Sequence, residues 1–269
     1  MKVFSPNYKY IIDSNDNILL TLTEDLNEFN PTLLNIGDLK EPSKPVEVIS
    51  VVFDLEGFTK FTKQVDPQLS IPNYISEFFE WLFEEIKKQF LTKNGSLYAE
   101  LPFFSKFMGD GALFLWKIDM DKIAKMGQDI QKDKLLYQFN EFICNIVASV
   151  YNVYSSFDEF NKSATKKYVD TPAKLRCGIA RGNVFPIGGG LDFVGPCINI
   201  SSRLQKFNGL SFAFSARGIV DEEFDASIKS DIIKKSVNIR GIGDGELIYV
   251  LREEFDKLPE EYKSHFKNV

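Results

Sequence analysis

The sequence predicts an α+β fold with a ferredoxin-like βαββαβ core. Three observations predict it. The apolar run from Val48 to Leu55 is typical of a core strand that is covered on both faces. Two longer segments, Tyr74 to Phe90 and Leu135 to Tyr154, carry apolar residues at the three-to-four spacing of amphipathic helices. Strand-like segments between and after them give the order strand, helix, two strands, helix, strand.

The first helix is preceded by the turn signal Asp66-Pro67, so we expect Thr59 to Pro72 to form a loop or a short helix. The apolar face of the helix then consists of Ile75, Phe78, Phe79, Leu82, Phe83, Ile86 and Phe90. Aromatic residues at helical spacing are more often core than ligand contacts, so we assign this face to the core.

A hairpin is expected after the first helix. Two strand-like stretches, Ser96 to Phe104 and Ala112 to Trp116, flank Gly109-Asp110-Gly111. Glycine and aspartate between two β segments predict a tight turn. A polar connector, Met120 to Lys134, then leads to the second long helix.

The remaining elements are shorter. Strands are expected at Lys174 to Ala180 and Asn183 to Ile187, followed by a hairpin loop at glycines 188–190. A helix begins near Pro196, because proline is favoured at the first helical position. Two strands, Phe212 to Ser215 and Leu247 to Leu251, are expected to complete the sheet. A short helix is expected between them, at Gly218 to Phe224.

These elements divide the chain into three parts. Residues 46–252 form the predicted domain. Residues 1–45 form an N-terminal arm with one candidate strand, Ile18 to Leu22, and we expect this arm to pack against the domain. Residues 253–269 are a charged tail, expected as a solvated helix or a frayed end.

Composition excludes several classes of protein. The chain has 269 residues, 44% of them hydrophobic, and a net charge of −6 without a basic run, which disfavours nucleic-acid and anionic-membrane binding. No apolar stretch reaches the ~18 residues of a membrane span, and no secretion signal is visible. Three separate cysteines, Cys144, Cys177 and Cys197, indicate a reducing compartment. We expect a cytoplasmic protein.

Two common chemistries lack their residues. The only histidine, His265, lies in the charged tail, which disfavours a hydrolase that needs a Ser/His or Cys/His pair. No Gly-x-x-x-x-Gly-Lys-Ser/Thr loop occurs either. Phosphate chemistry would therefore depend on metal ions and arginine.

Two carboxylates suggest a metal site. Asp54 ends the first strand and shares a strand face with Val52, and Gly57 lets the backbone turn close to a ligand. If the hairpin pairs beside this strand, Asp110 comes close to Asp54. Paired carboxylates with phosphate oxygens suit Mg²⁺ or Mn²⁺. Alternatively, Asp110 is a turn residue and Asp54 a cap.

A third stretch carries donors for a phosphoryl group. On the helix that begins near Pro196, Asn199 and Arg203 are four residues apart and share a face. An amide beside a guanidinium can stabilise charge that develops on phosphorus. Together, and in this order, the stretches 51–59, 106–111 and 192–204 resemble class III nucleotidyl cyclases. The resemblance runs from about Val48 to about Leu251.

The resemblance implies roles for single residues. Asp54 and Asp110 match the family's metal-binding aspartates, with the Leu55 carbonyl as a further ligand and two Mn²⁺ or Mg²⁺ ions per site. The other matched positions are Lys106 and Asp192 for the nucleobase, Asn199 for the ribose and Arg203 for the transferring phosphorus, with Val52 and Phe58 expected to contact the nucleotide. Family sites lie across a dimer interface, and this chain carries both residue sets, so the resemblance implies a homodimer with two shared sites.

One position departs from the family. Many members carry a phosphate-contacting lysine where this chain has Ile242. Arg240, two residues earlier and expected on the same strand face, is a candidate substitute. An exposed strand arginine is, however, often only a solvated edge charge.

The substrate base stays open between three candidates. Lys106 donates and Asp192 accepts, which suits adenine, cytosine or uracil. The stretch 54–61, followed by 66–72, resembles the pyrimidine cyclases of bacterial antiphage (Pycsar) systems, which make cyclic UMP or cyclic CMP for a separate effector protein. This resemblance favours UTP or CTP as substrate. An adenylate cyclase is the first alternative, and a catalytically inactive nucleotide-binding module is the second.

Overall fold

Strand β3 (Val46–Glu56) is an inner strand of the antiparallel part of a larger mixed sheet. It pairs with β5 (Gly111–Lys117) on one side and with β6 (Lys174–Ile187) on the other, and β4 (Phe104–Phe107) pairs with β5. The spatial order β6-β3-β5-β4 therefore places the fourth, first, third and second strands of the core side by side. This arrangement confirms the predicted ferredoxin-like core.

The computed structural model describes residues 8–12, 14–15, 18–22, 43–91, 99–118, 132–207 and 209–269. The predicted connector, Met120 to Lys134, and the start of the predicted strand at Ser96 fall mostly outside these ranges. Within them, no helix is both long and apolar enough to cross a membrane.

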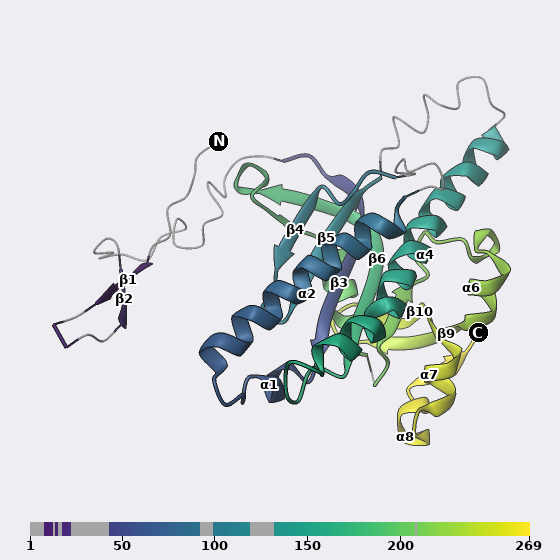
Figure 1. The fold of residues 1–269 in the computed structure, drawn as a ribbon. Helices are drawn as coiled ribbons and strands as arrows, with labels where there is room; N and C mark the ends of the chain where they lie inside the picture. The colour runs from purple at the N-terminus through teal and green to yellow at the C-terminus, as the bar shows by residue number, and fades with distance from the viewer. Residues whose placement is uncertain are drawn as a thin grey trace. The chain divides into compact units, whose positions relative to one another are not determined.

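Two helices cover one face of the sheet (Figure 1), namely α2 (Pro67–Gln89) and α4 (Lys132–Ala164). The core between them and β3 is made by alternate residues of the strand, Ile49, Val51, Phe53 and Leu55. Helix α2 starts seven residues before the predicted position, because Pro67 occupies its first turn and Asp66 accepts a hydrogen bond from Ser70. A short helix, α1 (Phe58–Phe61), precedes it.

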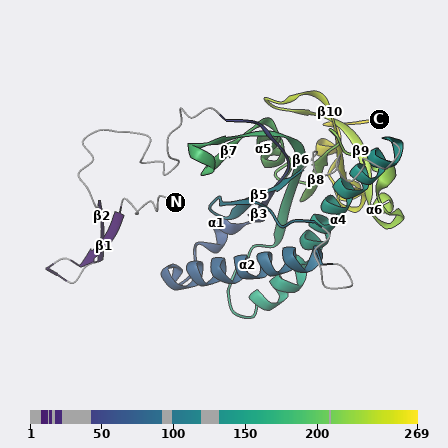
Figure 2. The ribbon, with the colours of Figure 1, turned by 90° about the horizontal axis from the view of Figure 1, so that it is seen from above.

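The opposite face of the sheet carries α5 (Pro196–Leu204), as Figure 2 shows. Close approach is possible because Gly178 of β6 has no side chain. A Cβ there would lie 2.0 Å from the carbonyl oxygen of Ser201. Ser201 also shares a buried hydrogen bond of 2.8 Å with Ser50 of β3. Helix α5 is thus held on the face of β3 that bears Val52 and Asp54.

The sheet continues beyond β6. Strand β8 (Phe212–Ser215) pairs with β6 in parallel, and the antiparallel strands that follow are β10 (Gly243–Leu251), β9 (Ile232–Ile239) and β11 (Phe266–Asn268). Between β8 and β9 lie a 3₁₀ turn, η3 (Asp221–Glu223), and helix α6 (Ala226–Asp231), at and just beyond the predicted short helix.

The C-terminal segment is more ordered than the sequence predicts. It forms α7 (Arg252–Lys257), α8 (Glu260–Lys263) and the edge strand β11, rather than a frayed end. Its few apolar residues explain the difference. The ring of Phe266 contacts those of Phe207 and Phe255, and Leu258 is buried. The charged positions concealed this apolar contribution.

Other boundaries differ in detail. The two strands predicted from Lys174 to Ile187 are one continuous strand, β6, because Arg181 pairs with Glu47 and Gly182 stays extended within it. Strand β4 starts where the predicted strand ends, so Lys106 lies in a strand rather than before a turn. All three cysteines are buried and unpaired.

The chain divides into two compact units. One contains residues 46–184 and 195–269, and therefore all elements from β3 onward except the end of β6 and β7 (Asp192–Val194). The other contains residues 1–45 and 185–194. In it, β1 (Tyr8–Ile12) pairs with β2 (Ile18–Leu22), which confirms the predicted strand there, and η2 (Gly188–Gly190) forms the predicted loop before β7.

Candidate active site

Asp54 and Asp110 meet at the end of β3. Asp54 stands opposite Gly111 of β5 in the register, and the Leu55 amide donates to the Asp110 carbonyl at 3.1 Å. No side chain fits at Gly111, where a Cβ would lie 2.1 Å from the carbonyl oxygen of Phe53. This close pairing brings the second carboxylate to the first, as the sequence predicts.

The turn that holds Asp110 is a tight hairpin between β4 and β5. The Met108 amide donates to the Gly111 carbonyl at 2.9 Å, and Gly109 has a φ of 88°. A positive φ of this size favours glycine. The predicted turn is therefore confirmed.

The electrostatics of the pair favour a bound cation. Burial, and then the neighbouring carboxylate of Asp54, raise the pKa of Asp110. Asp54 is itself only 5% exposed. A carboxylate whose ionisation is disfavoured in this way is stabilised when a divalent ion lies beside it.

Two basic residues near Asp54 were not predicted. Arg176 of β6 donates to Asp54 Oδ2 from Nε at 3.0 Å and from Nη2 at 2.5 Å. Lys206 Nζ, just after α5, lies 3.7 Å from Oδ1. The sequence feature that could have indicated Arg176 is the alternation of side chains along β6, which puts Arg176 on the same face as Gly178. Only the β3–β6 register shows that this face meets Asp54.

The donor set fits Mg²⁺ or Mn²⁺. Leu55 directs its amide toward the Asp110 turn, and the carbonyl of a strand residue points to the same side as its amide. Two carboxylates and one carbonyl are hard oxygen donors. Among the described residues, no group of three or more His, Cys, Asp or Glu side chains is arranged to hold a metal ion by itself. Substrate phosphates or water would have to supply the remaining ligands, as is usual for Mg²⁺.

Asn199 and Arg203 share the exposed side of α5, as their spacing predicts. The opposite side of the helix is buried against the sheet through Cys197, Ile200, Ser201 and Leu204. A Cβ at Gly241 would lie 3.6 Å from Arg203 Nη2. The guanidinium therefore lies against the turn between β9 and β10.

That turn contains both Arg240 and Ile242, so the prediction that they share a strand face is wrong. The amide of Ile242 donates to the Ile239 carbonyl, and Gly241 has a φ of 76°, which closes the turn. Arg240 nevertheless lines the same groove as Arg203.

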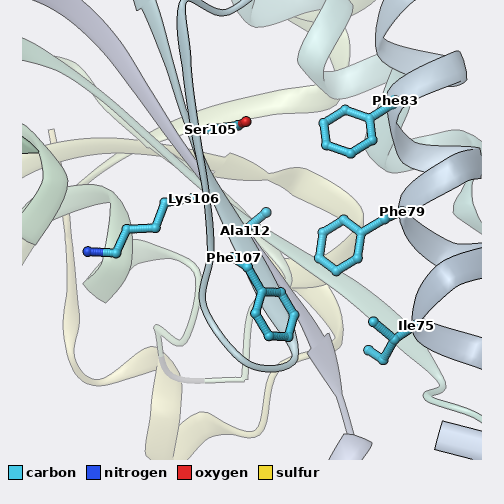
Figure 3. Close-up of a pocket in the computed structure, with 7 residues that line it drawn as sticks. All are labelled: Ile75, Phe79, Phe83, Ser105, Lys106, Phe107 and Ala112. Atoms are coloured by element: carbon cyan, nitrogen blue, oxygen red, sulfur yellow. The ribbon is translucent and has the colours of Figure 1, made fainter. Parts of the chain in front are cut away.

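Lys106 lies on the face of the sheet that bears Val52. The register aligns Lys106 of β4 with Leu113 of β5, and Leu113 with Val52 of β3. Figure 3 shows Lys106 directed away from Phe79 and Phe107, whose rings belong to an apolar groove on the other face. Val52 is 2% exposed, so it is a buried residue on the sheet face that carries Lys106.

Phe58 packs against the core instead of projecting into open space. Its ring centroid lies 5.6 Å from that of Phe61 and 6.5 Å from that of Tyr74. Contact with a nucleotide would therefore involve the backbone amides that follow Glu56 rather than the Phe58 ring.

Asp192 is buried at the start of β7, where one carboxylate oxygen accepts a hydrogen bond of 2.8 Å from the Phe193 amide. It belongs to the unit of residues 1–45 and 185–194, whereas Lys106 belongs to the other. Their pairing on a nucleobase stays a prediction.

Of the comparisons with known proteins, the one with solved structures found similar folds. No family model and no curated protein matches the sequence. Two structures of a bacterial light-regulated adenylyl cyclase are similar, with TM-scores of 0.52 and 0.51, 15% identity and 81% of this chain covered. The adenylyl cyclase CyaB from P. aeruginosa matches more loosely, with a TM-score of 0.48, 14% identity, and 78% of this chain and 96% of that chain covered.

This chain therefore has the fold of nucleotidyl cyclase catalytic domains. It spans about half the length of the light-regulated enzymes, covering 55% and 54% of their chains. At 15% identity, this structural similarity shows the fold alone, and the activity has to be argued from the site.

Proposed function

We propose that this protein is a metal-dependent nucleotidyl cyclase. The ribose 3′-hydroxyl of a nucleoside triphosphate would attack its own α-phosphorus, giving a 3′,5′-cyclic nucleotide and diphosphate. The observation that carries the proposal is the Asp54–Asp110 pair at the end of β3, with a raised Asp110 pKa, on a sheet whose same face holds α5.

Each residue set has a distinct task. Asp54, Asp110 and the Leu55 carbonyl would hold two Mn²⁺ or Mg²⁺ ions, which lower the pKa of the hydroxyl and neutralise phosphate charge. Asn199 would orient the ribose, and Arg203, exposed and on the same side of α5, would stabilise charge on the phosphorus.

For the base, we propose a pyrimidine, so that UTP or CTP is the substrate. Lys106 and Asp192 would bind its edge. Phe104 follows the same alternation as Lys106 in β4, and with Val52 and Leu113 it offers apolar surface that could fill the space of a missing purine ring. The adenylyl cyclases that share this fold favour ATP as the second candidate substrate.

The proposed biological unit is a cytoplasmic homodimer with two shared sites, in which one protomer supplies the carboxylates and the other supplies Asn199 and Arg203. Its cyclic nucleotide would act as a second messenger in antiphage defence and would be sensed by a separate effector protein. No nucleic-acid or membrane partner is part of this proposal.

Incubation of the purified protein with Mn²⁺ and each of the four nucleoside triphosphates tests the proposal. We expect cyclic UMP or cyclic CMP, identified by mass, and no product from Asp54→Ala. Cyclic AMP as the main product would show that the substrate is ATP and not a pyrimidine nucleotide. No product from any nucleotide would overturn it.

One observation favours a second candidate, an inactive nucleotide-binding module. The Asp54 carboxylate is already paired with Arg176, which competes with a metal ion. If this candidate is correct, nucleotides bind and raise the melting temperature. Mn²⁺ then causes no further increase in the melting temperature, and no product forms.

A further inference from the structure

A basic groove of about 610 Å³ lies beside the exposed side of α5. Three segments far apart in the sequence line it, namely the end of α5, the end of β9 with its turn, and residues 264–267 at the C-terminus. Its cationic residues are Arg203, Lys206, Arg240 and Lys267, and His265 also lines it. None of the described residues that line it is acidic.

Among the described residues, two cations of this groove, Arg203 and Lys267, lack the ion pairs that other basic residues form, whereas Lys206 lies 3.7 Å from Asp54 Oδ1. Arg176, Arg181 and Arg217 each form an ion pair with an aspartate or glutamate. Within the described part of the chain, no ion pair involves Arg203 or Lys267. Gathering unpaired positive charge in a concave surface is unfavourable unless an anion binds there.

The C-terminal strand is held at this groove by its own packing. Strand β11 pairs with β9, with Lys267 opposite Ser236, a residue of the groove lining. Phe266 contacts the ring of Phe207, which follows α5. The segment therefore joins the edge of the sheet to the end of the helix that carries Arg203.

We propose that β11 completes a polyphosphate site, in which Lys267, supported by His265, binds the β- and γ-phosphates together with Arg240. This inference rests on the proposed function, which supplies a triphosphate substrate and a diphosphate product. It gives the C-terminal segment the phosphate-binding task that Ile242 cannot perform. Arg203 lies at the α5 side of the groove, where it would face the reacting phosphorus.

Tripolyphosphate, which has no base or ribose, is the probe for this site. Calorimetric titration of the 269-residue protein without metal should show binding, and Lys267→Gln should weaken it about tenfold through loss of a charge-assisted contact. Arg240→Gln should weaken it similarly, while Lys267→Arg should retain most of the affinity. Lys257→Gln is the matched control, since Lys257 lies in the same segment, is exposed and is absent from the groove lining.

Enzyme kinetics supply a second measurement. In Lys267→Gln, we expect the KM for the nucleoside triphosphate to rise about tenfold with kcat nearly unchanged, because uniform binding is lost. Wild-type affinity for tripolyphosphate in both Gln variants would overturn the inference, whether or not the protein is a cyclase. If the two Gln variants lose tripolyphosphate binding but the wild type makes no cyclic nucleotide, the polyphosphate site is supported and only the proposed function is overturned.

Discussion

Asp54 is the residue on which the proposed chemistry depends, and its surroundings serve the fold as well. It is a buried carboxylate with three charged neighbours, namely Arg176, Lys206 and Asp110. Without metal, Arg176 satisfies Asp54, while Asp110 is left with a raised pKa. Ionisation of Asp110 is therefore unfavourable in the metal-free protein, and a bound divalent cation would make it favourable.

Asp110→Asn should separate metal binding from stability. Because the folded-state pKa of Asp110 is raised, the metal-free protein loses stability as pH rises from the ordinary aspartate value through that raised pKa. At neutral pH, the variant should therefore melt at the same or a higher temperature than the wild type in EDTA. It should also lose the increase in melting temperature that Mn²⁺ gives the wild type, as measured by calorimetry.

Asp170→Asn is the control for this change, since Asp170 is an exposed carboxylate that pairs only with Lys60 among the described residues. It should respond to Mn²⁺ like the wild type. An Asp110→Asn protein that Mn²⁺ stabilises fully would remove Asp110 from the metal site.

Arg176→Gln should have opposite effects on stability and metal affinity. Asp54 would lose two hydrogen bonds from a charged donor, which lowers the free energy of unfolding by about 2 kcal/mol in the absence of metal. The affinity for Mn²⁺ should rise, because a competing cation is removed. Denaturant unfolding with and without Mn²⁺ measures both.

Arg217→Gln is the matched control, because it removes a surface ion pair with Glu246. This substitution should lower the free energy of unfolding by less than about 1 kcal/mol. If Arg176→Gln costs no more than this control, the Arg176–Asp54 pair is not a structural contact in solution.

At the scale of the elements, β3 and α5 form the frame of the site. Val52 and Asp54 face α5, whereas Val51 and Phe53 face the helices on the other side. The bare backbone of Gly178 is what allows α5 to reach this face. The position of Arg203 therefore depends on a glycine in a neighbouring strand.

Gly178→Ala should displace α5. Its Cβ would overlap the Ser201 carbonyl oxygen and lie 2.5 Å from the Gln205 amide nitrogen, both of them backbone atoms. We expect a loss of about 1–3 kcal/mol in the free energy of unfolding and a clear decrease in cyclase rate. Denaturant unfolding and product formation measure the two effects.

The comparison for this prediction is Ser50→Ala. Ser201 keeps its hydrogen bond to the Ile198 carbonyl, so the loss of the Ser50 contact should cost only about 1 kcal/mol. Equal effects of the two substitutions would contradict the close-approach explanation.

The sequence predicts these elements well and their contacts poorly. Apolar periodicity identified β3, α2 and α4, and Pro196 marked the start of α5, because these signals are local. The Arg176–Asp54 pair depends on the register between strands 122 residues apart, which no local pattern records. Arg240 was predicted on a strand but lies in the turn directly after β9, because Gly241, with its φ of 76°, closes the turn there. The aromatic contacts that anchor β11 were concealed by charged neighbours.

At the scale of the whole molecule, the proposal requires two copies of the chain. The carboxylates at the end of β3 and the exposed side of α5 belong to one compact unit, and Lys206 approaches Asp54 within the same chain. A site across a dimer interface and a site within one chain therefore make different predictions, and complementation distinguishes them.

The most direct measurement is the activity of a mixture of two inactive variants, Asp54→Ala and Arg203→Ala. Arg203→Ala should lower the rate ~10²-fold or more without changing the melting temperature, because the residue is exposed. If each site takes its carboxylates from one protomer and its arginine from the other, half of the randomly exchanged dimers regain one of two sites, and the mixture recovers about a quarter of wild-type activity. A mixture as inactive as its components, with exchange verified by differently tagged chains, would contradict the shared site.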